Sequence, residues 1–144
     1  MLLQEFFKNA NWLAIGVAAL TYWIIGALFY SALFRKPWMA GHKIEMPTAP
    51  DEIAKMKKSM PMVMVMGLLM NIVVAIIVGM FVMALGSIHC ISGMKLGLAL
   101  SFLATIPLLM SHSYTMKSMK LWVIDGGYHV ISITLMSIII SVWH

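Results

Sequence analysis

The sequence predicts an all-α integral membrane protein, a four-helix bundle with both termini on the extracytoplasmic side. Hydrophobic residues make up 62% of its 144 residues and charged residues only 10%, with a mean hydropathy of +0.94. Soluble domains carry about 25% charged residues, so this composition belongs in a lipid bilayer. Four apolar runs reach the length of about 20 residues that crosses the hydrocarbon core, which leaves no room for another sizeable domain. We therefore expect residues 1–144 to form a single membrane domain.

The first apolar run, residues 12–34, follows Asn11 and ends at Arg35 and Lys36. It is too long for the core of a signal peptide, and it lacks a basic leader and a small-residue cleavage site. The basic pair at its end is typical of a stop-transfer signal. We therefore expect this run to be retained as the first span.

A polar segment, residues 35–59, separates the first span from the second. It contains Pro37, Pro47 and Pro50 and most of the charged residues of the chain. In its second half, residues 51–58, acids precede bases, an order that the helix dipole favours. We expect a short amphipathic helix there, lying on the cytoplasmic surface.

The other three spans are expected at residues 61–85, 94–113 and 121–143. Pro61 suits the first turn of the second span, because the N–H that it lacks would have no helical partner there in any case. Pro107 lies inside the third span, where the loss of a backbone donor favours a kink.

Lysine and arginine residues are distributed unevenly between the two ends of these spans. Eight of the ten lie in the 35–59 segment or in the 114–120 loop, and only Lys8 and Lys95 lie on the opposite side. By the positive-inside rule the side with eight faces the cytoplasm, so both termini face outward. Four tryptophans then fall near the membrane interfaces, at Trp12, Trp38, Trp122 and Trp143.

Small residues recur at helical spacing on the first three spans. In lipid, helices associate through close packing of such residues, because the hydrophobic effect supplies no drive between them. The candidate packing positions are Gly16, Gly26, Gly67, Ala75, Gly79 and Gly97. We expect these faces to form one interior, and spare faces to support a homo-oligomer or a larger membrane complex.

The fourth span carries an aspartate and a histidine one helical turn apart. Asp125 is the only acid in the four apolar runs, and a charge at the bilayer centre costs about 2.5 to 3.5 kcal/mol on insertion scales. Because an acid beside an imidazole can share a proton, Asp125 and His129 predict a proton or cation relay. The other residues of the expected polar interior are Asn71, Tyr30, His112 and Tyr128.

The same residues also allow a purely structural interpretation. Asp125 could meet a lysine of the 114–120 loop or water near the membrane surface, and His129 could bond to Asn71 or Tyr30. In that case the polar groups stabilise the contacts between the helices and transfer no proton or cation.

The sequence gives less support for a metal site, an enzyme active site or a nucleic-acid interface. No HExxH or CxxC spacing occurs, and the 16 methionines cannot form one copper site because alternate residues of a helix point in different directions. Nucleophile and base pairs, phosphate-cradling glycine loops and basic nucleic-acid stripes are also missing, and the single Cys90 excludes an internal disulfide. We expect no metal, no cofactor, no catalytic residue and no nucleic-acid partner.

Taken in order, these residues resemble a family of small bacterial membrane proteins of unknown function, numbered seventeen sixty-one. The resemblance rests on Asn11 and Trp12, on residues 26–31 leading to Lys36 and Trp38, and on residues 121–129. Ala32 stands where the family typically has proline. The resemblance implies four spans and a multi-pass location in the bacterial inner membrane, and it implies nothing about activity.

Two functional hypotheses follow. The first is a transporter or channel subunit that handles a proton or small solute through the polar interior near Asp125 and His129. The alternative is a non-catalytic accessory or scaffold subunit of a larger membrane complex. A membrane enzyme acting on a lipid-like substrate is the least favoured class.

Overall fold

The computed structural model describes residues 2–143, and within them every regular element is a helix. Four helices are long and apolar enough to cross a membrane. The first consists of α2 (Trp12–Ala27) and its continuation η1 (Leu28–Leu33), and the others are α4 (Pro50–Ala84), α5 (Cys90–Tyr114) and α6 (Met119–Val142). Two short helices, α1 (Leu2–Asn9) and α3 (Arg35–Gly41), flank the first span. The expected all-α, four-span class is confirmed.

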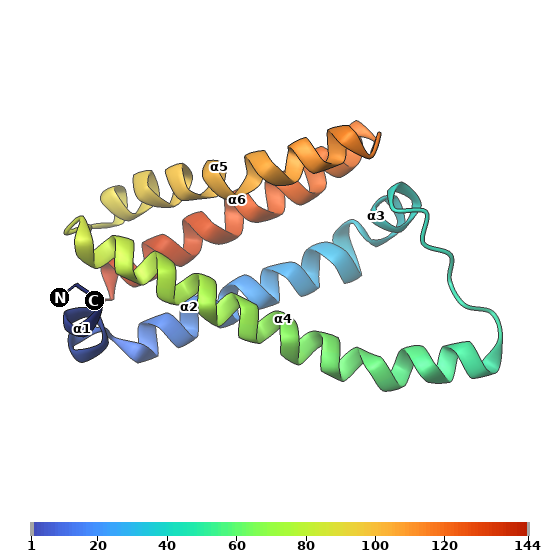
Figure 1. Cartoon of the computed structure of the whole chain (residues 1–144), viewed down its shortest axis with the longest axis horizontal. Helices are drawn as coiled ribbons and strands as arrows, with labels where there is room; N and C mark the ends of the chain where they lie inside the picture. Colours follow the sequence, from blue (N-terminus) through green and yellow to red (C-terminus); the bar gives the residue numbers. More distant parts are fainter. Residues whose placement is uncertain (1, 144) are drawn as a thin grey trace.

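Helix α6 is the centre of the bundle. Half of the residues in its most apolar stretch are buried, whereas 22 to 28% are buried in the corresponding stretches of the other three spans. It pairs with α5 as an antiparallel hairpin, and α2 and α4 lie along its other side (Figure 1). The chain ends lie together with α1 and the 85–89 turn, whereas α3 and the 115–118 turn lie at the opposite end. We call these the terminal end and the α3 end.

The seam between α5 and α6 is built from small residues. A methyl group added at Gly97 would lie 2.6 Å from the Cα of Thr134 and 2.9 Å from the Cβ of Ser137. One turn earlier, a methyl group at Gly93 would lie 2.6 Å from the Oγ of Ser141. The two backbones therefore approach too closely for any side chain at either glycine, as expected for helices that associate in lipid.

The candidate packing residues do not all face the interior. Gly97 lies in the α5–α6 seam, Gly79 packs against Phe6, and Ala75 is fully buried in the core. A methyl group at Gly26 would lie 2.9 Å from the hydroxyl of Tyr128.

The remaining two positions are looser. Gly67 has only the Trp23 ring nearby, at 4.0 Å. Gly16 is exposed, and a methyl group added there would meet no atom within 4 Å. A small residue marks a helix contact only where another helix lies on the same side, and Gly16 faces away from α4 and α6.

Helix α4 is longer than the second span expected from the sequence. Its 35 residues run without a break from Pro50 to Ala84, so the 51–58 helix continues directly into the span. At about 1.5 Å per residue the helix is about 52 Å long, well beyond the roughly 30 Å of a hydrocarbon core. Pro50 occupies the first turn, and Pro61 lies inside the helix, where only the carbonyl of Lys57 loses its donor.

The last turn of the first span is a π-helix. In η1 the Phe34 N–H donates to the carbonyl of Phe29 at 2.8 Å, five residues back instead of four. Such single-turn insertions shift the direction of the side chains that follow and occur often at functional sites. Tyr30 lies within this turn.

Candidate functional site

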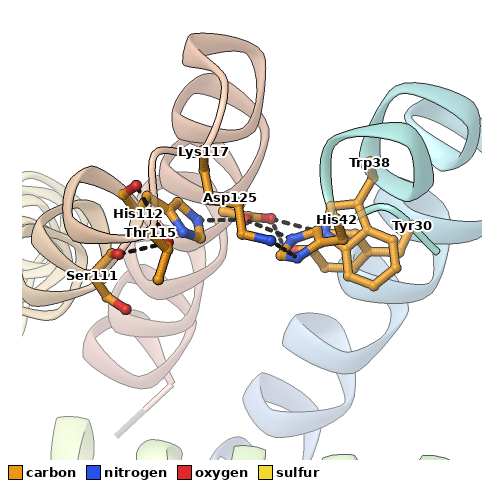
Figure 2. Close-up of polar contacts among 8 residues, drawn as sticks. All are labelled: Tyr30, Trp38, His42, Ser111, His112, Thr115, Lys117 and Asp125. Atoms are coloured by element: carbon orange, nitrogen blue, oxygen red, sulfur yellow. Dashed lines mark hydrogen bonds and ion pairs between the residues drawn. The ribbon is translucent and has the colours of Figure 1, made fainter.

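The polar centre of the α3 end is the carboxylate of Asp125, whose side chain is only 7% exposed. Three donors from three different elements reach it (Figure 2). The hydroxyl of Tyr30 in η1 and the indole N–H of Trp38 in α3 donate to Oδ1 at 3.0 and 3.2 Å. Nε2 of His112 in α5 lies 2.8 Å from Oδ2.

Close backbone approaches bring these elements together. The Cα of Gly41, the last residue of α3, lies so near Leu121 that an added methyl group would be 2.6 Å from Cγ of that side chain. On the opposite side of α6, Gly126 faces Thr105 of α5. Because α3 and α5 both lie close to α6 here, side chains from both reach Asp125.

His42, which follows α3 directly, lies between the carboxylate and the end of the bundle. Its Nε2 is 3.7 Å from Oδ2 of Asp125, and its Nδ1 is 3.5 Å from Nζ of Lys117. The side chain is 24% exposed, yet Nε2 is buried and has no hydrogen-bond partner within residues 2–143. Since a lysine ammonium only donates, Nδ1 must accept and the ring proton lies on Nε2, which faces Asp125.

The donors around Asp125 suit an ionised carboxylate, which only accepts hydrogen bonds. Bonds to a charged group are about twice as strong as bonds between neutral groups, and together they offset the cost of removing the carboxylate from water. The acid therefore lies in a preformed polar environment and not in bare lipid.

A second polar group lies next to the first. The hydroxyl of Tyr22 is 2.6 Å from Nδ1 of His129. The ring of Tyr128 packs between the two groups, with centroid distances of 5.3 Å to Tyr22, 4.9 Å to His129 and 5.1 Å to Tyr30. Aromatic side chains thus connect the Asp125 site to His129.

Asp125 and His129, the pair predicted from the sequence, lie close enough for the charge of the carboxylate to act on the imidazole, but they are not directly hydrogen-bonded. Within residues 2–143 no hydrogen bond or ion pair joins Asp125 to His129, which bonds to Tyr22 instead. Of the other expected residues, Tyr30 and His112 contact Asp125, and Tyr128 lies beside it in the aromatic contact with Tyr30. Asn71, on α4, takes no part in either polar group.

Three residues of the two groups were not expected from the sequence: Trp38, His42 and Tyr22. Lys117, a lysine of the loop that the structural interpretation placed near Asp125, contacts His42 instead. Trp38 fits a membrane interface equally well, and His42 and Lys117 lie in polar segments where such residues are common. The predicted topology is the signal that could have indicated them. It places the 35–59 segment and the 114–120 loop on the same side of the membrane as the start of the fourth span.

In the described part of the chain, no group of three or more His, Cys, Asp or Glu side chains could hold a metal ion. The geometry is that of a hydrogen-bonded acid with two neighbouring imidazoles.

Comparison with known proteins identifies the family of the chain. Residues 13–141 match the family described as a protein of unknown function (DUF1761), a region that runs from the first span into the last and includes the whole Asp125 site. No curated protein and no solved structure matches the chain. The resemblance found in the sequence is confirmed, and the chain belongs to the DUF1761 family of proteins of unknown function.

Proposed function

We propose that this protein is a small transport protein of the inner membrane, or the transport subunit of a larger complex, in which Asp125 accepts and releases a proton. The observation that supports it is the run of proton-exchanging side chains from Lys117 through His42 to Asp125. Ionisable groups inside a membrane are rare and mark proton relays and ion paths.

His42 is suited to passing a proton inward. An imidazole can take up a proton on one ring nitrogen and release the proton of the other, which leaves the neutral ring in its second tautomer. Nδ1 of His42 points toward Lys117 at the α3 end, and Nε2 points toward Asp125. A closer approach of about 0.5 Å between Nε2 and Oδ2 would bring the 3.7 Å separation within hydrogen-bond range.

Further polar side chains lie deeper in the bundle than Asp125 and could extend the path if water links them. The Tyr30 hydroxyl on Asp125 is followed by Tyr128 and then by the hydrogen-bonded Tyr22 and His129. These groups reach His129, ten residues beyond the start of α6, or about 15 Å at the helical rise. This depth corresponds to the middle of a bilayer, so the groups cover the α3 half of a path across it.

The proposal is tested by proton uptake into proteoliposomes that contain a pH-sensitive dye. Wild-type protein should acidify the vesicles in response to an imposed gradient faster than protein-free vesicles do. Asp125→Asn should remove the protein-dependent flux, because an amide keeps the shape of the carboxyl group and cannot carry its proton. Equal flux in wild type and Asp125→Asn would overturn the proposal.

A matched control separates the site from general charge effects. Asp51→Asn removes an exposed acid from the first turn of α4, outside the site, and should leave the flux unchanged. Helical content and elution volume should be equal in all three proteins, so that a lost flux cannot be attributed to unfolding.

A second candidate is the accessory or scaffold role, which the first half of α4 favours. Its apolar side chains between Met60 and Met66 are exposed, and in Figure 1 this half of the helix diverges from the rest of the bundle. Lipid can cover this surface, but so can a helix of another copy or of a different subunit. Purification in mild detergent should then yield a stoichiometric complex that Val63→Trp disrupts; a chain that always purifies as a monomer would exclude the role.

A further inference from the structure

The α3 end carries a groove on the outside of the bundle. It has a volume of about 420 Å³ and lies between the start of α3 and the start of α6. Its lining residues are Phe34, Pro37, Met119, Lys120, Val123 and Ile124. Five of the six are apolar, and Lys120 is the one charged residue among them.

The groove begins at the charged start of α6 and extends along the helix toward its apolar middle. Lys120 is one residue inside α6, and Val123 and Ile124 follow it by about one helical turn toward the middle of the span. The apolar walls therefore extend from the charged rim into the hydrocarbon layer. A ligand that fills the groove must combine a polar, anionic head with an apolar tail.

The charge of the surroundings has the sign that such a ligand needs. Lys120 and Lys117 lie on one side, and Arg35 and Lys36 directly precede Pro37 on the other. Basic pockets between membrane helices bind the headgroups of anionic lipids.

We propose that this groove is a binding site for an anionic phospholipid, with its phosphate near Lys120 and one acyl chain along Val123 and Ile124. The site is distinct from the proton path, although Ile124 immediately precedes Asp125. A lipid seated here covers the junction of α3 with α6, the same junction that brings Trp38 and His42 to the carboxylate.

Native mass spectrometry of the full chain in neutral detergent tests this proposal. Phosphatidylglycerol and phosphatidylcholine with identical acyl chains are titrated separately, and the apparent affinity for the first bound lipid is measured. Wild-type protein should prefer phosphatidylglycerol. Lys120→Gln should lower the affinity for phosphatidylglycerol about fivefold, the effect of one basic residue near an anionic surface, and leave that for phosphatidylcholine unchanged.

Two further variants make the test specific to the groove. Val123→Trp places a large ring in the groove and should therefore weaken the binding of both lipids. Because the Val123 side chain is 72% exposed, this replacement should leave the core intact. Lys95→Gln removes a lysine at the terminal end and should change neither affinity.

Three results would overturn the proposal. They are equal affinity of the wild type for the two lipids, an equal loss in Lys95→Gln and Lys120→Gln, and undiminished binding in Val123→Trp. Glycerol phosphate should not displace the bound phosphatidylglycerol; displacement would show that the site recognises a free phosphate ester and not a lipid.

Discussion

Nε2 of His112 lies 2.8 Å from Oδ2 of Asp125, and this contact joins the last turns of α5 to the first turns of α6. Both side chains are almost fully buried. The pair therefore acts at the place where the hairpin of α5 and α6 meets η1 and α3, and its loss should affect both the stability of the bundle and the chemistry of the acid.

The first prediction concerns this pair. His112→Ala leaves a buried carboxylate without its shortest hydrogen bond, so the free energy of unfolding should fall by about 3 kcal/mol, the lower range for breaking a buried ion pair. Unfolding in mixed micelles by a denaturing detergent measures the change. Ser113→Ala, at the exposed position next to His112 on α5, is the control. Equal stability of the two variants would contradict the assigned contact.

A second prediction separates His129 from Asp125. A double-mutant cycle with Asp125→Asn and His112→Gln should give a coupling energy between about 0.5 and 3 kcal/mol, as for residues in direct contact. The cycle with Asp125→Asn and His129→Gln should give less than about 0.5 kcal/mol, because His129 bonds to Tyr22. A larger coupling to His129 than to His112 would contradict the assignment of His112 as the direct partner of Asp125.

The third prediction uses one substitution at two glycines. Gly97→Ala introduces a methyl group 2.6 Å from the Thr134 Cα, so it should lower the free energy of unfolding by about 1 to 3 kcal/mol. Gly16→Ala meets no atom within 4 Å and should be neutral or raise the free energy of unfolding by up to about 1 kcal/mol through helix propensity. The same unfolding assay measures both. Similar losses at the two sites would contradict the α5–α6 seam.

Topology gives the fourth prediction. Cys90, exposed at the start of α5, lies toward the terminal end, and Met116 is 94% exposed in the turn at the α3 end. A membrane-impermeant maleimide added to intact cells should label Cys90 in the natural sequence. It should label the thiol of Met116→Cys, in a Cys90→Ser background, only after the cells are opened. Labelling of both from outside would exclude a crossing by α5.

Most of the fold follows from the sequence because lipid imposes a simple rule on spanning segments. Long apolar runs must be helices that satisfy their own backbone. The four runs, their order and the start of the first span directly after Asn11 agree with the structure. The short helices α1 and α3 were not expected, since seven or eight residues give little periodic signal. The continuous α4 was missed because Pro61 looked like a helix start.

Less of the site could be predicted. Asp125 stands out because it is a lone acid in apolar surroundings, and a neighbour one turn away is the natural partner to expect. The actual partners come from η1, α3 and α5, and their positions depend on a π-turn at Tyr30 and on the approach of Gly41 to Leu121. Neither the π-turn nor the close approach of two helices has a recognisable pattern in the sequence. His42 in particular belongs to the site only because the end of α3 packs against α6.

The central claim, that a proton reaches Asp125 through His42, is tested most directly by chemical rescue. In proteoliposomes His42→Ala should lower the protein-dependent proton flux by about a hundredfold, the typical contribution of a positioned proton-transfer group. Because the His42 side chain is 24% exposed, added imidazole can enter the space that the variant leaves. We predict that imidazole restores a substantial part of the flux in His42→Ala and none in Asp125→Asn. Wild-type flux in His42→Ala without imidazole, or a lost flux that imidazole does not restore, would contradict the account.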